Sequence, residues 1–340
     1  MNKLIAILSL AGAALLLQST AMAADGCADM RPGLNHITVV SGGQKQNIDL
    51  LLPGSFDSSQ QVPLVIGLHP SGGSGVTFDQ DTGLGAAANA KGFAVIFPDG
   101  GITQSRTDGG AGYYWNIPGV PLIGGDAVPS GARDDVRFLA DVIDHVVKHS
   151  CVNARRIFVT GFSGGARMSS TVGCRLADRV TAVAPIAGLR AGRAASPAFD
   201  EPDAADCRPS RSLSVLAVHG TDDPTNPFPG GEGPRWGYSV ERAAARWASL
   251  DHCGATPALE KIAAHVTGLH YGACGAGSEV ILYRIDAPRD QGGGHVWPGG
   301  HRDLSTRAPT ASGGSANGAT REPAVGVDAT AVVLEFFARH

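Results

Sequence analysis

Charged residues are few in this sequence, and neither sign dominates. They make up 17% of the 340 residues, and the formal net charge is −4. A chain this close to neutral has no basic excess to attract a nucleic acid or an anionic membrane, so neither is expected as a partner. Glycine and proline, 47 and 21 residues, stay below the share typical of a disordered polymer. Hydrophobic residues account for 43%, enough for a sizeable core.

The longest apolar run lies at the N-terminus and is too short for a membrane span. Lys3 precedes the apolar residues 4–17, and the small residues "AMA" follow at 21–23. This order is typical of a cleaved secretory signal peptide over 1–23, whereas a membrane helix needs roughly 20 apolar residues. A buried N-terminal helix is the alternative. We expect a secreted protein, extracellular or periplasmic, whose single domain spans 24–340.

The six cysteines lack the spacing of a metal site. No pair forms C-x-x-C and none lies beside a histidine cluster, so a zinc site is not expected. Export into an oxidising compartment makes disulfides the expected state. Sequence spacing leaves many disulfide pairings open. It favours only one pair, whose two cysteines flank a short segment. The six are Cys27, Cys151, Cys174, Cys207, Cys253 and Cys274, and the last two are that pair.

Strand-length apolar runs alternate with helical patterns along the chain. A strand pair surrounds the turn "SGGQK", and continuous apolar runs follow, which are typical of parallel strands buried on both faces. These runs are 62–68, 93–97, 156–160, 213–218 and 279–285, and the helical patterns are 134–149, 239–250 and 328–340. The predicted fold is therefore α/β, a three-layer sandwich whose mostly parallel central sheet carries helices on both faces. The polar stretch 302–324 is expected to be a long surface loop.

The strongest chemical signal is "GFSGG", with Ser163 at its centre. It joins the strand at 156–160 to a helical pattern, the context in which G-x-S-x-G presents a nucleophilic serine. The alternative is a tight turn with an incidental serine. A serine hydroxyl needs a base to take its proton, and the base needs an acid to orient it.

On such a fold the acid and the histidine follow the serine in that order. The loop "HGTDDPTNP" offers Asp222 or Asp223, and "GGGHVWPGG" offers His295, each just after an apolar strand. Parallel strands bring their carboxyl ends to one edge, so we expect His295 to be the general base, with Trp297 on the pocket wall. His219 lies in the acid's own loop, where we expect it to orient the backbone. The other histidines after Ser163 lack a placement just after a long apolar strand: His252, His265, His270 and His301.

Two N–H donors are needed for the oxyanion of an acyl-transfer reaction. Gly164, directly after the serine, is the first candidate. The loop "HPSGGSG" supplies the second, Ser71 or Gly72, because Pro70 has no N–H. A plain glycine turn is the alternative for that loop. Trp115 and Trp236 are candidate substrate-pocket aromatics, and a core role is equally open for each.

Six motifs in order resemble a known enzyme family. They are "LHPSGG", "FPDG", "TGFSGGARMSS", "VAPIAGL", "HGTDDP" and "GGGHVWPGG", and they extend over almost all of the mature chain. The chain is similar to the polyhydroxybutyrate depolymerase and feruloyl esterase family of secreted α/β-hydrolases. The family pattern "HGTxDP" implies Asp223 as the acid, and it implies the cysteine pairs 27–151, 174–207 and 253–274. Pro70 and Ser71 depart from the glycine and cysteine frequent in that family, which puts the oxyanion loop in doubt.

The resemblance implies a serine carboxylic-ester hydrolase that works through an acyl-enzyme without cofactor or metal. The first expected substrate is a 3-hydroxybutyrate polyester or its oligomers, and a feruloyl or acetylxylan ester of plant cell wall is the alternative. The chain ends with its catalytic domain, which argues against crystalline polyester. Two less favoured hypotheses for the function are a non-catalytic polymer-binding protein and a peptidase. A dinucleotide-binding oxidoreductase is not expected, because the glycine loop of this chain lacks the motif G-x-G-x-x-G. The oligomeric state is not set by the sequence.

Overall fold

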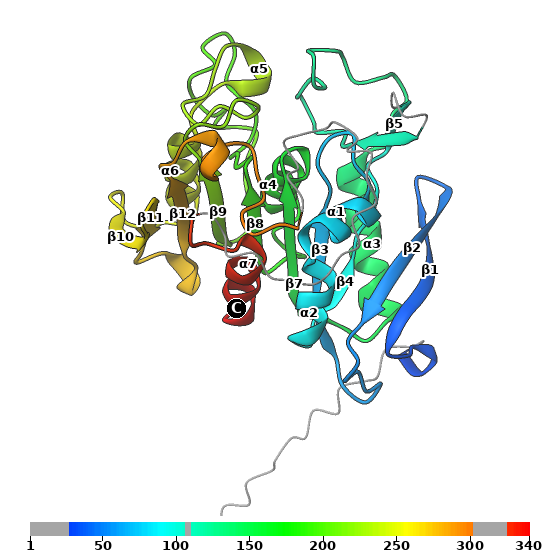
Figure 1. The fold of residues 1–340 in the computed structure, drawn as a ribbon. Coiled ribbons are helices and arrows are strands. Elements are labelled where there is room, and N and C mark those ends of the chain that lie inside the picture. The colour runs from blue at the N-terminus through cyan, green and yellow to red at the C-terminus, as the bar shows by residue number, and fades with distance from the viewer. Residues whose placement is uncertain (1–26, 106–109, 302–324) are drawn as a thin grey trace, which may run out of the picture.

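The computed structural model describes residues 27–105, 110–301 and 325–340. The expected signal peptide over 1–23 and the expected surface loop over 302–324 lie outside these ranges. A ten-stranded sheet forms the centre of the molecule (Figure 1). Its order is β1 (Gly33–Ser41), β2 (Gln44–Leu52), β4 (Ala94–Ile96), β3 (Val62–Leu68), β7 (Val152–Phe162), β8 (Ala182–Ile186), β9 (Ser214–Gly220), β12 (Val280–Ile285), β11 (Val266–Tyr271) and β10 (Ala258–Ala263).

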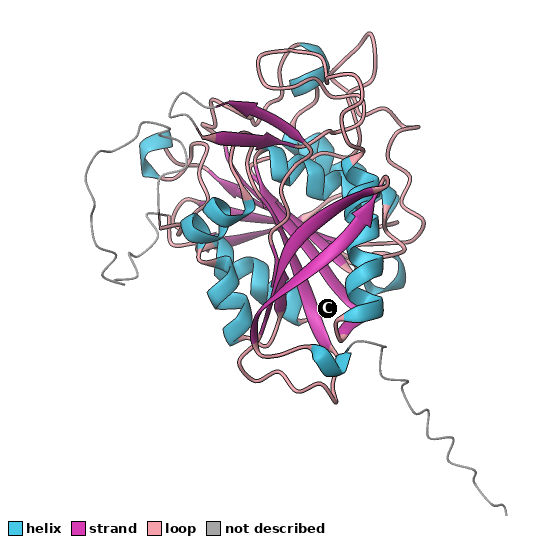
Figure 2. Cartoon of the chain, turned by 90° about the vertical axis from the view of Figure 1, so that its right-hand side faces the viewer, coloured by secondary structure: helices cyan, strands magenta, loops and turns pink. Residues whose placement is uncertain are grey.

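The middle of this sheet is parallel and its edges are antiparallel. Strands β4, β3, β7, β8, β9 and β12 run parallel, and β1–β2 and β10–β11 add antiparallel pairs at the two edges. Figure 2 shows the long β1–β2 pair crossing one side of the molecule. The five apolar runs correspond to β3, β4, β7, β9 and β12, so the predicted parallel strands are confirmed. All seven residues of β9 are buried, as expected for a strand covered on both faces.

Helices cover both faces of the sheet and form two separate cores. On one face pack α3 (Asp135–His149), α4 (Gly164–Arg175) and α6 (Val240–Leu250). On the other pack α1 (Gly75–Thr82), α2 (Leu84–Ala90) and α7 (Ala329–Ala338). The predicted helices at 134–149, 239–250 and 328–340 are α3, α6 and α7. Each begins at a side-chain N-cap, Asp134, Ser239 and Asp328 respectively. The predicted three-layer α/β sandwich is confirmed.

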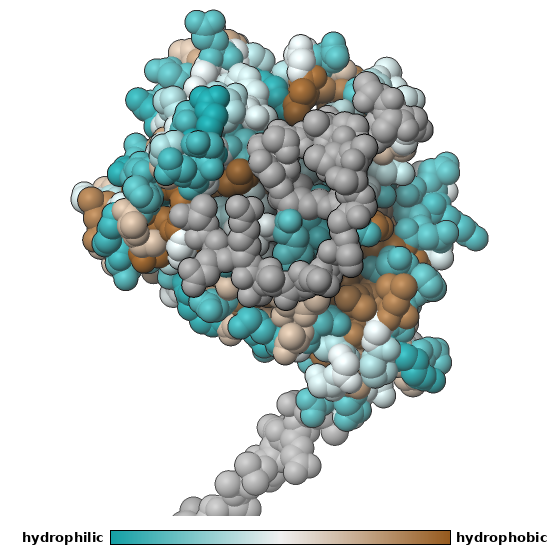
Figure 3. Space-filling view, viewed as in Figure 1, coloured by the Kyte–Doolittle hydropathy of each residue, from teal (hydrophilic) through white to brown (hydrophobic). Residues whose placement is uncertain are grey.

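The remaining elements are short and lie mainly above the sheet. The hairpin β5 (Ile102–Ser105) and β6 (Ala111–Tyr114) and the single turn α5 (Gly233–Trp236) lie at the top of Figure 1, on the side away from the end of α7. Short 3₁₀ turns are η1 (Cys27–Asp29), η2 (Gly275–Gly277) and η3 (Arg289–Gln291). The face in Figure 3 mixes polar and small apolar areas. Within the described ranges, no helix has the length and apolarity to cross a membrane.

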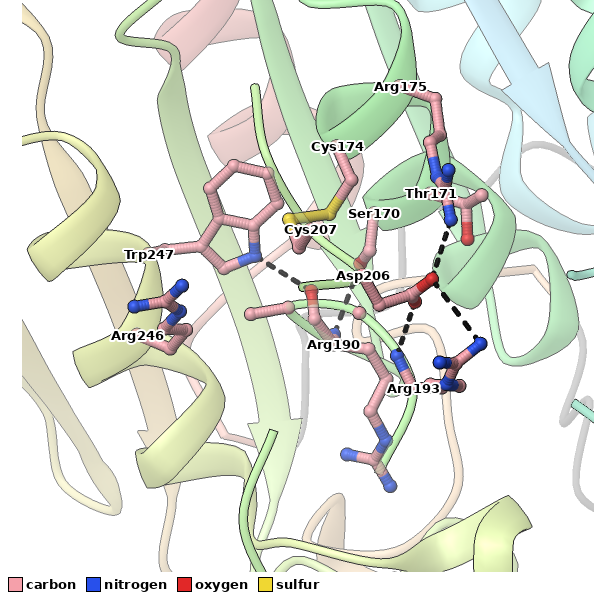
Figure 4. Close-up of a disulfide and its surroundings, with 12 residues drawn as sticks. Ser170, Thr171, Cys174, Arg175, Arg190, Arg193, Asp206, Cys207, Arg246 and Trp247 are labelled. Atoms are coloured by element: carbon pink, nitrogen blue, oxygen red, sulfur yellow. Dashed lines mark hydrogen bonds and ion pairs between the residues drawn. A yellow bond between two sulfur atoms is a disulfide. The ribbon is translucent and has the colours of Figure 1, made fainter. Parts of the chain in front are cut away.

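Three disulfides join distant parts of the chain. They pair Cys27 with Cys151, Cys174 with Cys207, and Cys253 with Cys274. These are the pairs that the family resemblance implied. The second bridge ties the end of α4 to the loop before β9 (Figure 4).

Candidate active site

Ser163 lies on a sharp turn between β7 and α4. Its backbone has φ 55° and ψ −112°, a conformation that L-residues adopt only under strain. A Cβ at Gly165 would overlap the carbonyl oxygen of Leu68, and a Cβ at Gly161 would lie 2.6 Å from the carbonyl carbon of Gly165. Both flanking glycines are therefore needed for the turn to close. The Ser163 N–H donates to the Ile186 oxygen at 3.0 Å, which fixes the turn on β8.

Asp223 lies three residues beyond β9 and contacts His295. Its Oδ2 is 2.7 Å from His295 Nδ1, and its Oδ1 accepts from the N–H groups of Thr225 and Asn226, each at 2.8 Å. Burial acts to raise the pKa of Asp223, but hydrogen bonds from His219 and His295 outweigh it and hold that pKa well below its usual range. The carboxylate is thus kept ionised beside the imidazole.

Asp222 points the other way and holds the histidine loop. Its carboxylate accepts from the backbone and guanidinium of Arg289, at 3.0 to 3.2 Å, on an exposed surface. The Asp222 N–H donates to the Gly293 oxygen at 3.0 Å. A Cβ at Gly220 would overlap that same oxygen, so a glycine is required where the two loops meet. The acid loop and the His295 loop are therefore one packed unit.

The imidazole of His295 is buried, with 6% of the residue exposed. Its ring packs on Phe162 with a centroid distance of 4.7 Å. Because Nδ1 faces the Asp223 carboxylate, we assign the proton of the neutral imidazole to Nδ1. Nε2 is then the hydrogen-bond acceptor. Within the described residues no hydrogen bond joins the Ser163 hydroxyl to His295. Such contacts are often long in enzymes without substrate and tighten on binding.

Ser71 and Gly164 meet beside the serine. A Cβ at Gly164 would overlap Ser71 Oγ and would lie 3.1 Å from the Ser71 nitrogen. Both residues line one small cavity together with Trp115. The Gly72 N–H donates to the Tyr113 oxygen at 2.7 Å, so it is already used. Among the described residues, no acceptor takes the Ser71 N–H, so Ser71 is the better placed of the two donors that the sequence left open.

A buried histidine that the sequence reasoning missed supports this loop. His69 Nδ1 is 2.8 Å from the Pro70 oxygen, and its Nε2 accepts from the Gly100 N–H at 2.9 Å. Burial lowers the pKa of His69, so the ring is held neutral, as these two bonds require. Its ring stacks on Trp115 at 4.9 Å. The signal was present in "LHPSGG", where a histidine follows a buried strand.

Of the three tryptophans proposed for the substrate pocket, only Trp297 departs from the expectation. Trp297 is 3% exposed, donates to Thr330 Oγ1 at 3.0 Å and packs edge-on against Phe78. It therefore belongs to the core behind His295 and does not line the pocket, which corrects the expectation. Trp115 lines the cavity of Ser71, but its indole nitrogen is occupied by the His69 oxygen at 2.9 Å. Trp236 lies at the edge of a second cavity.

Within the described ranges, no other histidine forms a hydrogen bond with Ser163 either. His219 Nε2 is 2.8 Å from the Asn226 oxygen and 3.3 Å from Asp223 Oδ2, so it braces the acid loop. His270 pairs with Glu260 on the edge strands β10 and β11. Over the described part of the chain, no group of three or more His, Cys, Asp or Glu side chains is placed to hold a metal ion.

The chain is similar in sequence to feruloyl esterases. It is 29% identical over 250 residues to feruloyl esterase B of Piromyces equi, a match that covers 72% of this chain and 41% of that relative. It is 25% identical over 211 residues to feruloyl esterase C of Emericella nidulans, covering 61% of this chain and 64% of that relative. No protein-family model matches the chain.

Among solved structures, the acetyl xylan esterase from Aspergillus awamori has a similar fold. The TM-score is 0.54 at 14% identity, and the match covers 77% of this chain and 94% of that one. At this identity the likeness concerns the fold alone.

Proposed function

We propose that this chain, a serine carboxylic-ester hydrolase of the α/β-hydrolase family that includes the feruloyl esterases, releases acyl groups esterified to plant cell-wall polysaccharide. The similarity to the two feruloyl esterases supports this substrate over polyhydroxybutyrate, the substrate that the sequence motifs first suggested. The three disulfides support export to an oxidising compartment. The proposal includes removal of residues 1–23 as a secretory signal peptide.

The contact that carries the proposal is the buried pair of Asp223 and His295. A 2.7 Å contact between a carboxylate and Nδ1 stabilises the imidazolium that forms when Nε2 takes a proton. Burying a carboxylate and an imidazole together costs free energy, because both groups lose their contact with water. Such a pair is therefore expected where it serves a function. With Ser163 on its strained turn, the three residues have the order and the loops that a hydrolase triad requires.

In the proposed reaction, Ser163 Oγ attacks the ester carbonyl carbon while its proton passes to His295 Nε2. The tetrahedral oxyanion accepts hydrogen bonds from the N–H groups of Ser71 and Gly164, each typically worth about 3 kcal/mol of barrier. His295 then protonates the leaving alkoxide, the C–O bond breaks, and the acyl group stays on Ser163. Water, deprotonated by His295, attacks the acyl-enzyme, and the carboxylic acid leaves as Ser163 regains its proton.

A direct assay of wild type and Ser163→Ala tests this proposal. The substrates are methyl ferulate, acetylated xylo-oligosaccharides and the 3-hydroxybutyrate dimer capped as its amide. We expect Ser163-dependent release of ferulate or acetate, and loss of turnover in a Ser163→Ala variant that keeps the wild-type circular dichroism and melting temperature. Full activity of that variant would exclude the mechanism. Faster cleavage of the 3-hydroxybutyrate dimer would replace the cell-wall substrate with a polyester.

A further inference from the structure

Five arginines line a cavity beside α4, and three of them have no acidic partner among the described residues. Arg167 lies one turn after Ser163 on α4, Arg190 follows β8, and Arg235 belongs to α5. Only 2% of Arg167 and 7% of Arg190 are exposed, and Arg235 is half-buried. Arginine is rarely buried without a partner, so the charge balance of this cavity needs an explanation.

None of these three arginines forms an ion pair within the described residues. Their hydrogen bonds reach only backbone carbonyl groups, which carry no formal charge. Arg190 donates to the Trp236 oxygen at 2.8 Å and to the Leu189 oxygen at 3.0 Å. Arg167 donates to the Arg235 oxygen, and Arg235 donates to the Pro121 oxygen.

The one acidic residue that lines this cavity, Asp206, already has partners. Asp206 accepts from Arg175 at 2.5 Å and from the Arg193 N–H at 2.8 Å. Arg193 also pairs with Asp203 at 2.7 Å. Figure 4 shows these contacts around Asp206 and the Arg190 guanidinium directed away from them. Arg175 and Arg193, called the outer arginines, are thus neutralised by acids. Arg167, Arg190 and Arg235, called the inner arginines, are not.

The inner arginines also leave hydrogen-bond donors unused. Nε and Nη2 of Arg167 and Nε of Arg235 are buried without an acceptor among the described residues. Burial, followed by repulsion from Arg190, lowers the pKa of both, and that of Arg235 falls to about 10. An unpaired buried charge is strongly unfavourable unless an opposite charge joins it. Asp223 attracts Arg167 and Arg190 only as one of the smaller causes, and a negatively charged acceptor in the cavity would supply both an opposite charge and the missing hydrogen bonds.

This cavity adjoins the cavity of the oxyanion donors. Ile117, Val120 and Arg235 line both, and the second one also holds Ser71 and Gly164. An extended ligand whose ester carbonyl lies at Ser163 would pass Arg235 to reach Arg167 and Arg190.

We propose that these three arginines form a pocket for a carboxylate carried by the ester substrate itself. The planar fork of a guanidinium matches the two oxygens of a carboxylate, and a bound carboxylate supplies the charge that the cavity lacks. The inference rests on the proposed ester hydrolysis at Ser163. Two sources share this chemistry: the terminal carboxylate of a hydroxyacid oligomer, and a uronic acid beside an acylated sugar.

Matched substrate pairs distinguish these sources. The first pair is the 3-hydroxybutyrate dimer as free acid and as its amide, and the second is acetylated xylo-oligosaccharide with and without a glucuronic acid branch. Wild type is expected to favour the charged member of one pair by about 10- to 100-fold in kcat/KM, the usual range for a hydrogen bond to a charged group. The pair that shows the preference identifies the source.

Arg235→Gln tests the pocket itself, because Arg235 is only half-buried and lies between the two cavities. The charged-to-neutral ratio of kcat/KM is expected to fall toward one in this variant, mainly through KM. Arg242→Gln is the matched control, since it removes an exposed arginine of α6 that pairs with Glu201, outside the cavity. It is expected to keep the wild-type ratio.

A measurement on wild type alone covers the case in which Arg235→Gln fails to fold. Free 3-hydroxybutyrate is expected to inhibit methyl ferulate hydrolysis at least tenfold more strongly than 3-hydroxybutyramide. Ratios near one for both substrate pairs, or equal inhibition by acid and amide, would overturn the carboxylate pocket while leaving the esterase intact. Failure to cleave any ester, methyl ferulate included, would instead overturn the proposed function.

Discussion

Asp222 and Asp223 are adjacent and chemically identical, yet they have different neighbours. Asp223 is buried against His295 and His219, whereas Asp222 lies on the surface against Arg289. Sequence order alone left the two equally eligible, because a one-residue shift in a loop reverses which side chain points inward. Family resemblance selected Asp223, and the structure places Asp223 on the histidine.

The pair offers a matched test. Asp223→Asn is expected to lower kcat by about 10³ to 10⁴, because an amide in place of the carboxylate favours the wrong tautomer of His295. Asp222→Asn is expected to change kcat less than about tenfold, since it weakens only an exposed contact with Arg289. Steady-state hydrolysis of methyl ferulate by both variants measures the difference. Equal losses in the two would remove Asp223 from its proposed role.

Gly164 allows a second test at this scale. In Gly164→Ala the new methyl group would overlap Ser71 Oγ and push the oxyanion loop away from the serine. We expect kcat to fall about 10²- to 10³-fold, the usual loss for one oxyanion donor, with a smaller change in KM. Adding Ser71→Ala removes the overlapping oxygen and is expected to recover part of the activity. A double variant as slow as the single one would mean that Ser71 is not the displaced group.

At the scale of elements, the sequence was most informative where a strand is apolar throughout. Strands β3, β9 and β12 are continuous apolar runs, and their loops gave Ser71, Asp223 and His295. The edge strands β10 and β11 were not predicted. Most of β10 is exposed and carries charged residues, and polar residues and a glycine interrupt the apolar pattern of the more buried β11. The short buried strand β8 was also missed. The arginine pocket was not predictable, since Arg167, Arg190 and Arg235 come from three separate segments that share no pattern.

The end of α6 carries a buried carboxyl whose titration affects stability. Asp251 accepts from the Leu213 N–H at 2.9 Å through Oδ1, and its Oδ2 has no partner among the described residues. Burial raises the pKa of Asp251 from 3.8 to about 7. Between these two values the folded state holds a proton that the unfolded state has released, so folding becomes less favourable as the pH rises through this window.

Asp251→Asn is expected to flatten that dependence. In wild type the unfolding free energy falls as the pH rises from 4 to 8. In the variant this fall should be smaller, by at most ~4 kcal/mol for a pKa shift of this size. Urea unfolding at a series of pH values measures the slope, and Asp290→Asn, at an exposed position, is the matched control. An unchanged slope in Asp251→Asn would assign the pH dependence to other groups.

For the whole molecule, the disulfides differ most in the length of chain that they close. Cys27 and Cys151 are 124 residues apart and tie the first described turn, η1, to the start of β7, whereas Cys253 and Cys274 are 21 apart beside α6. A longer closed loop removes more entropy from the unfolded chain, and the relation predicts ~1.5 kcal/mol more stabilisation from the longer one. The two bridges thus constrain the unfolded ensemble to different degrees.

Double alanine variants of each pair test this difference. We expect Cys27→Ala/Cys151→Ala to lower the unfolding free energy by ~1.5 kcal/mol more than Cys253→Ala/Cys274→Ala, because the lost constraint spans most of the first half of the sheet. Both cysteines of the longer pair are also buried, so a cavity term acts in the same direction. Equilibrium urea unfolding of both variants and of the oxidised wild type gives the comparison. If the short-loop variant proved the less stable one, local contacts around α6 would outweigh the chain entropy of the unfolded state.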